Sequence, residues 1–211
     1  MTAAAEDWAD LPRRERRKRE VRARIAGAAL ELFDENGFAA TTVVQICERA
    51  DVAHKTFFNH FPSKQHVLRD VAQDYLDRLL VMVEEARKYP GSARARLEYF
   101  FKCVADRAEE NPMQRELVTE VVHVAHEMGT EREQAEMLRD AFGAMIREGV
   151  ASGQLTRKHS IQTQTEMLLG AYYALMFNWA NLEDYPLRRQ ARAGARLLAD
   201  ALCTSDGRSG A

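Results

Sequence analysis

The chain has 211 residues, of which 46% are apolar and 29% are charged, a balance that excludes a wholly disordered protein. Its three cysteines are too few and too scattered for a disulfide framework or a zinc site. The net charge of −2 is not that of a typical nucleic-acid-binding domain, but it averages over two unlike parts of the chain.

No stretch of the sequence is apolar for long enough to cross a membrane. The longest such stretch, residues 167–180, is shorter than the roughly 20 residues that a membrane span needs. The first ten residues include Glu6, Asp7 and Asp10, which is not the pattern of a secretory signal. We therefore expect a cytoplasmic protein with no membrane partner.

Apolar residues recur with helical rather than strand periodicity along nearly the whole chain, so the predicted fold class is all-α. Glycine and proline mark the boundaries between the helices. The boundaries divide the chain into an N-terminal domain over residues 13–66 and a larger helical domain over residues 67–203. Nine helices are predicted, over residues 17–36, 43–50, 54–61, 64–88, 93–111, 112–128, 131–153, 161–182 and 187–203.

Positive charge is concentrated in the N-terminal part. Residues 11–66 hold 11 basic and 7 acidic side chains, a net of +4, whereas residues 67–211 hold 19 basic and 22 acidic, a net of −3. Eight of the basic side chains fall between Arg13 and Arg24. This run is either a solvated helix face or an arm or helix start that contacts phosphates or the minor groove of DNA.

The second and third predicted helices are short and joined tightly at residues 51–53, which is the layout of a helix-turn-helix. Ile46 in the first of them and Phe57 and Phe61 in the second supply inward-facing apolar side chains. The outward face of residues 54–60 is rich in His, Lys, Thr and Asn, which suits hydrogen bonding to base edges and phosphates in a major groove.

The run GFAATTVVQICERADVAHKTFFNHFPSK, residues 37–64, resembles the DNA-binding domain of the TetR family of bacterial transcriptional regulators. Many positions agree in one register, which is a far more specific signal than a lone short motif. The matching residues are Gly37, Phe38, Thr41, Thr42, Val43, Ile46, Ala50, Val52, Thr56, Phe57, His60, Phe61, Ser63 and Lys64.

Four positions depart from the family pattern. Cys47 replaces a small alanine in the core, and Asp51 replaces the glycine of the turn, so an aspartate has to hold the backbone geometry there. Ala53 replaces the serine that would cap the recognition helix, a loss of roughly 1 kcal/mol. Phe58 replaces a tyrosine whose hydroxyl reaches a DNA phosphate in the family.

The resemblance also implies which residues contact DNA. Thr42 and Lys64 begin helices, where a phosphate is favourably placed by free backbone N–H groups. Base or near-base contacts are expected from the outward face of the third helix, and phosphate contacts from its end and from the basic run. The predicted DNA-binding residues are Thr42, His54, Lys55, Thr56, Phe58, Asn59, His60, Lys64, Arg13, Arg14, Arg16 and Arg17.

In the family, the helices after the DNA-binding domain form a ligand-binding and dimerisation domain. Met and aromatic side chains at helical spacing are individually more often core than ligand contacts, but as a group they indicate an apolar small-molecule effector. The predicted pocket residues are Phe100, Phe101, Val104, Leu117, Val121, Val124, Met128, Phe142, Met145, Met167, Tyr172, Met176 and Phe177.

Small residues in the last two helices allow close helix packing, either between two copies or within one chain. A homodimer is expected because one short recognition helix reads too few base pairs, and two heads would read a palindromic double-stranded operator. The predicted dimer-interface residues are Gly170, Ala174, Trp179, Ala191, Gly194, Ala195 and Leu198.

Glu120, His123 and Glu127 share one face of the predicted sixth helix, which makes a metal site or an enzyme active site conceivable. A solvated, salt-bridged face is the simpler interpretation. No nucleophile motif accompanies these residues, so we expect neither enzyme activity nor a cofactor. The function predicted is that of a repressor released from its operator by an effector; the alternative is a DNA-binding regulator that needs no ligand.

Overall fold

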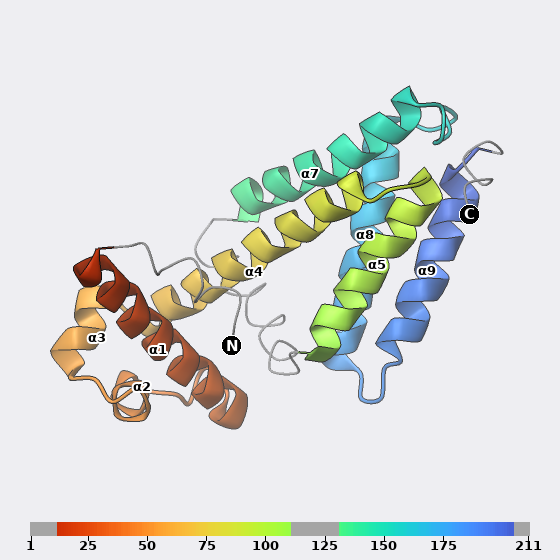
Figure 1. Cartoon of the computed structure of the whole chain (residues 1–211). Coiled ribbons are helices and arrows are strands. Elements are labelled where there is room, and N and C mark those ends of the chain that lie inside the picture. The colour runs from red at the N-terminus through yellow and green to blue at the C-terminus, as the bar shows by residue number, and fades with distance from the viewer. Residues whose placement is uncertain (1–11, 111–130, 205–211) are drawn as a thin grey trace. The chain divides into compact units, whose positions relative to one another are not determined.

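The computed structural model describes residues 12–110 and 131–204. These residues form eight helices and no strand, which confirms the all-α class (Figure 1). The predicted sixth helix, residues 112–128, lies outside the described residues. The helices are α1 (Arg13–Asn36), α2 (Val43–Arg49), α3 (His54–His60), α4 (Lys64–Lys88), α5 (Ala93–Glu110), α7 (Glu131–Ala151), α8 (Ile161–Asn181) and α9 (Leu187–Leu202).

Helix α1 begins four residues earlier than its apolar periodicity predicts. The carbonyl of Pro12 accepts the backbone N–H of Arg16 at 3.0 Å, which starts the helix ahead of its first apolar residue. Arginine favours helix almost as strongly as alanine does, so the basic run extends the helix instead of preceding it as a loop. Of the two possibilities, an arm or a helix start, the structure has the second, because Arg13, Arg14, Arg16 and Arg17 lie in the first turns of α1.

The chain divides into two compact units between Ala72 and Gln73. Helix α4 begins in the first unit and continues into the second. The domain boundary predicted from the sequence, at residues 66–67, falls within the first turn of the same helix. No described helix combines the length and the apolar character that a membrane crossing requires.

The first unit has its core where α1, α2, α3 and the start of α4 meet. Ile25 of α1, Ile46 of α2 and Phe57 of α3 are fully buried there. The hydroxyl of Thr41 is also buried and lies within hydrogen-bond distance of two carbonyls, those of Leu32 (3.0 Å) and Gly37 (2.9 Å). This hydroxyl stabilises the turn between α1 and α2. Apolar burial thus fixes the inner side of each short helix and leaves the other side exposed.

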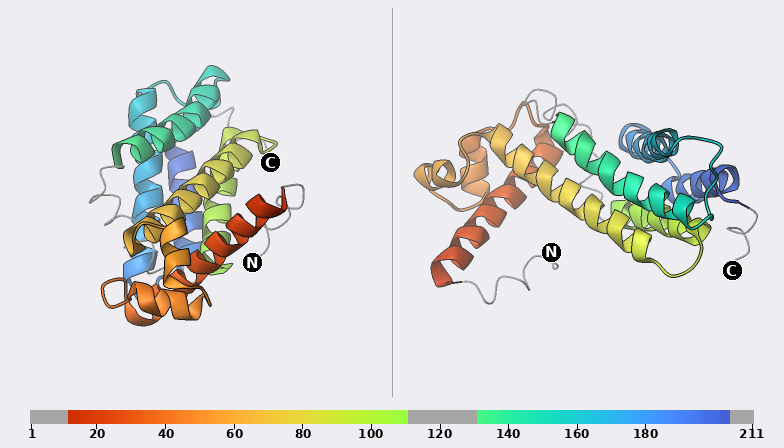
Figure 2. Two further views of the ribbon diagram at one scale, coloured as in Figure 1. Left: turned by 90° about the vertical axis from the view of Figure 1, so that its left-hand side faces the viewer. Right: turned by 90° about the horizontal axis from the view of Figure 1, so that it is seen from above.

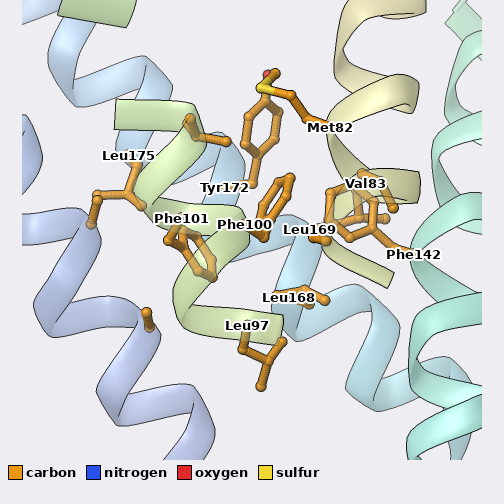
Figure 3. Close-up of a cluster of buried hydrophobic side chains, with 14 of the residues drawn as sticks. Met82, Val83, Leu97, Phe100, Phe101, Phe142, Leu168, Leu169, Tyr172 and Leu175 are labelled. Carbon is orange, nitrogen blue, oxygen red and sulfur yellow. The ribbon is translucent and has the colours of Figure 1, made fainter. Parts of the chain in front are cut away.

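The core of the second unit consists of apolar and aromatic side chains from α4, α5, α7, α8 and α9. Phe100 lies at its centre, with ring centroids 5.0 Å from Phe142 and 6.1 Å from Tyr172 (Figure 3). Helices α5 and α9 run side by side, whereas α7 crosses α8 at a steep angle and packs against it (Figures 1 and 2). Buried alanines of α9, Ala191 and Ala195, allow the approach to α5.

The segment after α7 joins the ends of three helices. Leu155 is buried and pairs in an isolated bridge with Cys203, and the backbone N–H of Thr204 donates to the Gln154 carbonyl. The Gln154 side chain accepts the backbone N–H of Ala93 at the start of α5. Residues 154–156 therefore connect the end of α9 to the beginning of α5, next to the place where α7 ends.

Candidate nucleic-acid interface

The turn between α2 and α3 has the geometry of a helix-turn-helix despite its unusual sequence. Thr42 caps α2 through a capping box, in which its hydroxyl accepts the Gln45 N–H and the Gln45 side chain accepts the Thr42 N–H. Asp51 adopts φ of 49°, the left-handed conformation that the family glycine would supply without strain. The expectation that aspartate can hold this geometry is confirmed.

Helix α3 begins without a side-chain cap, as Ala53 predicts, and presents its polar residues outward. His54, Lys55 and Asn59 are exposed and Thr56 is half-buried, while Phe57 is fully buried on the other side. Three of the four side chains predicted to contact bases are therefore exposed to solvent, and Thr56 is partly exposed.

Phe58 is 46% exposed although it is a large apolar side chain. Its ring packs edge-on against His54, with the centroids 4.9 Å apart, and against Phe57. The ring thus steadies the His54 imidazole on the outer side of α3. It cannot replace the hydrogen bond of the family tyrosine, because it carries no hydroxyl.

His60, at the end of α3, is half-buried, and its Nδ1 atom is buried without a hydrogen-bond partner among the described residues. Burial, together with the nearby charges of Arg22 and Lys18, lowers the pKa of its imidazole below the usual 6.5. His60 is therefore neutral at physiological pH and contributes no positive charge toward a phosphate.

Arg22 of α1 holds the recognition helix in place. Its guanidinium forms two hydrogen bonds with the Asp70 carboxylate of α4, at 2.6 and 3.0 Å, and a third with the carbonyl of His60 at 2.7 Å. The same guanidinium lies 4.1 Å from the centre of the Phe61 ring. One side chain therefore joins α1, the carboxyl end of α3 and α4.

Two further basic residues have structural partners. The Lys64 ammonium donates to the carbonyls of Phe38, Ala39 and Thr41 at 2.7–3.1 Å and lies over the Phe38 ring. Arg49 of α2 pairs with Glu31 and Glu35 of α1 at 3.2 and 2.7 Å. Their charges stabilise the frame, so they are not freely available to DNA.

The basic start of α1 is solvated. Arg13, Arg14 and Arg17 are exposed, and Arg16 is half-buried and lies 3.8 Å from Glu20. Arg13, Arg14 and Arg17 have no ion pair or hydrogen bond among the described residues, so their charges remain available to an anionic partner.

The pocket residues predicted in the second unit fall into three groups. Met167 and Phe177 are 55% and 65% exposed, on the side of α8 opposite Tyr172 and Met176. Leu117, Val121, Val124 and Met128 lie outside the described residues, as do Glu120, His123 and Glu127 of the conceivable metal site. The predicted pocket residues that are buried in the core are Phe100, Phe101, Val104, Phe142, Met145, Tyr172 and Met176.

The residues predicted for the dimer interface also fall into two groups, those at or near the surface and those buried within the chain. Gly170 and Ala174 are exposed on α8, next to Phe177, and Gly194 and Leu198 of α9 are half-buried. Trp179, Ala191 and Ala195 are instead buried within the chain. Small side chains in α9 serve packing against α5, which the sequence pattern alone cannot distinguish from packing between two copies.

Comparison with known proteins identifies the family to which the helix-turn-helix belongs. The family described as "Bacterial regulatory proteins, tetR family" matches residues 25–71, which contain α2, α3 and the start of α4. Residues 25–71 therefore belong to the TetR family of bacterial regulatory proteins. Members of this family are transcriptional regulators that bind DNA and small-molecule ligands and act as dimers.

Individual relatives are distant. The repressor KstR of Mycolicibacterium smegmatis is 30% identical over 102 residues, which cover 48% of this chain and half of KstR. The regulator UidR of Escherichia coli K12 is 24% identical over 177 residues, or 81% of this chain and 86% of UidR. The fold of FadR from Bacillus subtilis, solved with stearoyl-CoA, covers 84% of this chain and 97% of that one, with a TM-score of 0.71 and 19% identity.

The sequence pattern missed the central role of Arg22 and Asp70. Arg22 stands among eight basic residues and looks like one more solvated charge, and Asp70 lies beyond the recognisable motif. The signal available was periodicity: Arg22 directly follows Val21 and lies three residues before the buried Ile25, near the apolar side of the TetR-family α1.

We predict that Arg22→Ala destabilises the first unit by about 2 kcal/mol, because it removes an ion pair, a bond to a carbonyl and a cation–π contact together. Native-state hydrogen exchange of the α3 amides measures this loss locally. Asp70→Asn should cost about half as much, because the carbonyl bond remains. Arg19→Ala, an exposed arginine of the same helix, is the control, and equal effects of Arg19→Ala and Arg22→Ala would contradict the assignment.

Proposed function

We propose that this TetR-family regulator is a repressor whose homodimer binds a palindromic operator through α3. The observation that carries the proposal is the outer side of α3, where His54, Lys55 and Asn59 are exposed on a helix held by Arg22. Lysine suits the acceptors of guanine, and asparagine suits the donor and acceptor of adenine in the major groove.

The length of α3 supports a dimer. Seven residues make a helix about 10 Å long, which spans only a few base pairs. Two copies related by a twofold axis would place their α3 helices in successive major grooves about 34–36 Å apart. Phosphate contacts near Thr42 and Lys64 would use backbone N–H groups in the first turns of α2 and α4 that lie outside the capping box, such as that of Val43, because both side chains already have protein partners.

Selection of bound sequences from a random DNA pool should return a palindrome. Lys55→Ala and Asn59→Ala should each weaken binding to it by about 1–3 kcal/mol and relax the preference at one position of each half-site. Lys158→Ala, the same charge change in the second unit, should leave the affinity unchanged. A non-palindromic result would overturn the proposed mode of binding.

The arginines at the start of α1 are tested by measuring the affinity for the selected operator at several salt concentrations. If Arg13, Arg14, Arg16 and Arg17 contact phosphates, replacing all four with alanine should flatten the dependence of affinity on salt concentration, by about one unit of log–log slope per lost contact. An unchanged slope would show that this face is only solvated.

The outer side of α8 is the proposed dimer surface. Met167, Tyr173 and Phe177 are 55%, 48% and 65% exposed, and Gly170 and Ala174 lie between them without bulky side chains. Large apolar side chains seldom gather on a free surface, and glycine and alanine among them would let two helices approach closely.

Phe177→Glu should convert the dimer to a monomer, because a carboxylate would be buried at the helix contact. Sedimentation equilibrium measures the change in mass. Val81→Glu, at a 52% exposed position of α4, is the matched control and should remain dimeric. A Phe177→Glu protein that stays dimeric would place the interface elsewhere.

We propose an effector with a long apolar part, bound among the aromatic side chains of the second unit. The hydroxyl of buried Tyr172 forms a 2.8 Å hydrogen bond with that of half-buried Tyr75, and burial raises the pKa of both. Both hydroxyls therefore stay protonated and can orient a polar group of a ligand. FadR of Bacillus subtilis, solved with stearoyl-CoA, supports an acyl-CoA as the first candidate.

The effector would act by population shift: it binds better to a conformation whose two α3 helices are wrongly spaced for the operator. Adding stearoyl-CoA to the operator complex should release the DNA, whereas coenzyme A without an acyl chain should not. Fluorescence anisotropy of the labelled operator measures the release. Failure of stearoyl-CoA would exclude it as effector. Failure of a wide set of apolar ligands would favour a regulator that needs none.

A further inference from the structure

A hollow lies in the second unit, between α5 and α9. It encloses about 400 Å³, which falls in the range of small-molecule sites. Alanines of both helices, Ala95, Ala105, Ala191 and Ala195, are among the residues that line it. None of the α8 residues proposed for the dimer surface lines it.

Two stacked tyrosines line this α5–α9 groove and form an aromatic wall. Tyr99 of α5 stacks on Tyr89, with ring centroids 4.1 Å apart and planes inclined by 17°. Tyr89 itself is 37% exposed, so the pair stands at the protein surface. Stacked tyrosines present a flat, rigid surface that suits a planar ring of a ligand.

The acidic side chains of the groove already have partners. Asp106 pairs with Lys102 at 2.8 Å and with Arg188 at 3.3 Å. Glu98 lies 3.4 Å from Arg94. These contacts neutralise the carboxylates of the groove and also occupy Lys102 and Arg188.

Two of the basic side chains that line the groove, Arg192 and Arg196, are not occupied in this way. They line the same groove one helical turn apart, both are exposed, and neither has an ion pair or hydrogen bond among the described residues. Like charges at this spacing repel each other and weaken a helix, so an anion placed between them would relieve that cost. Guanidinium groups bind phosphate and carboxylate through paired hydrogen bonds.

We propose that the α5–α9 groove binds a small aromatic anion, with its ring against Tyr99 and its phosphate or carboxylate between Arg192 and Arg196. The site is separate from the proposed operator, dimer and effector surfaces. The result of testing this anion site is therefore independent of whether the proposed repressor function is correct.

The test uses the full chain, calorimetry and phenyl phosphate as the probe. Binding should be saturable, with a dissociation constant of about 1 mM or tighter. Inorganic phosphate, which lacks the ring, and phenol, which lacks the charge, should each bind at least about tenfold more weakly. Equal binding of phosphate would refute the aromatic wall, equal binding of phenol would refute the anion site, and no binding of phenyl phosphate would refute both.

Variants locate the site. Replacing Arg192 and Arg196 together with glutamine should weaken phenyl phosphate binding at least about tenfold, and Tyr99→Leu should weaken it about threefold. Arg157→Gln, an exposed arginine that lines neither this groove nor the hollow beside Arg192 and Arg196, is the matched control. Circular dichroism verifies that each variant is folded, and an Arg192/Arg196 variant that is folded and binds like Arg157→Gln would overturn the proposal.

Discussion

The recognition surface of the first unit depends on Arg22. Helix α3 is only seven residues long, starts without a side-chain cap and exposes most of its polar residues, so it cannot be stable alone. Burial of Phe57 and Phe61 fixes its inner side, and the Arg22 bond to the His60 carbonyl fixes its carboxyl end. Since Asp70 orients the guanidinium from α4, the position of α3 is coupled to the helix that continues into the second unit.

Basic residues in the first unit have two different tasks. Arg22, Arg49 and Lys64 bond to carboxylates and carbonyls of the protein and hold helices and turns together. Lys55 and the exposed arginines at the start of α1 have no such partners among the described residues and can approach DNA. Counting charges along the chain therefore overestimates the number available to phosphates, although it identifies the correct segment.

In the second unit, α8 and α9 each present two unlike sides. The inner side of α8 carries Tyr172 into the aromatic core, and its outer side carries exposed Phe177. Alanines of α9 bring it close to α5, while Arg192 and Arg196 stay at the surface beside the same contact. One pattern of small and large residues thus serves core packing, a proposed dimer surface and a proposed anion site.

The sequence by itself determined the all-α class, the boundaries of the eight described helices to within a few residues and the TetR-family DNA-binding frame, because periodicity, caps and a long motif are local properties. It also placed the polar side of α3 outward. Only the tertiary structure decided which arginines are structural, which small residues of α9 face α5, and which apolar residues of α8 are exposed. Those distinctions depend on contacts between residues far apart in the chain, such as Arg22 with Asp70 and Tyr75 with Tyr172, and a single sequence carries no local signal for them.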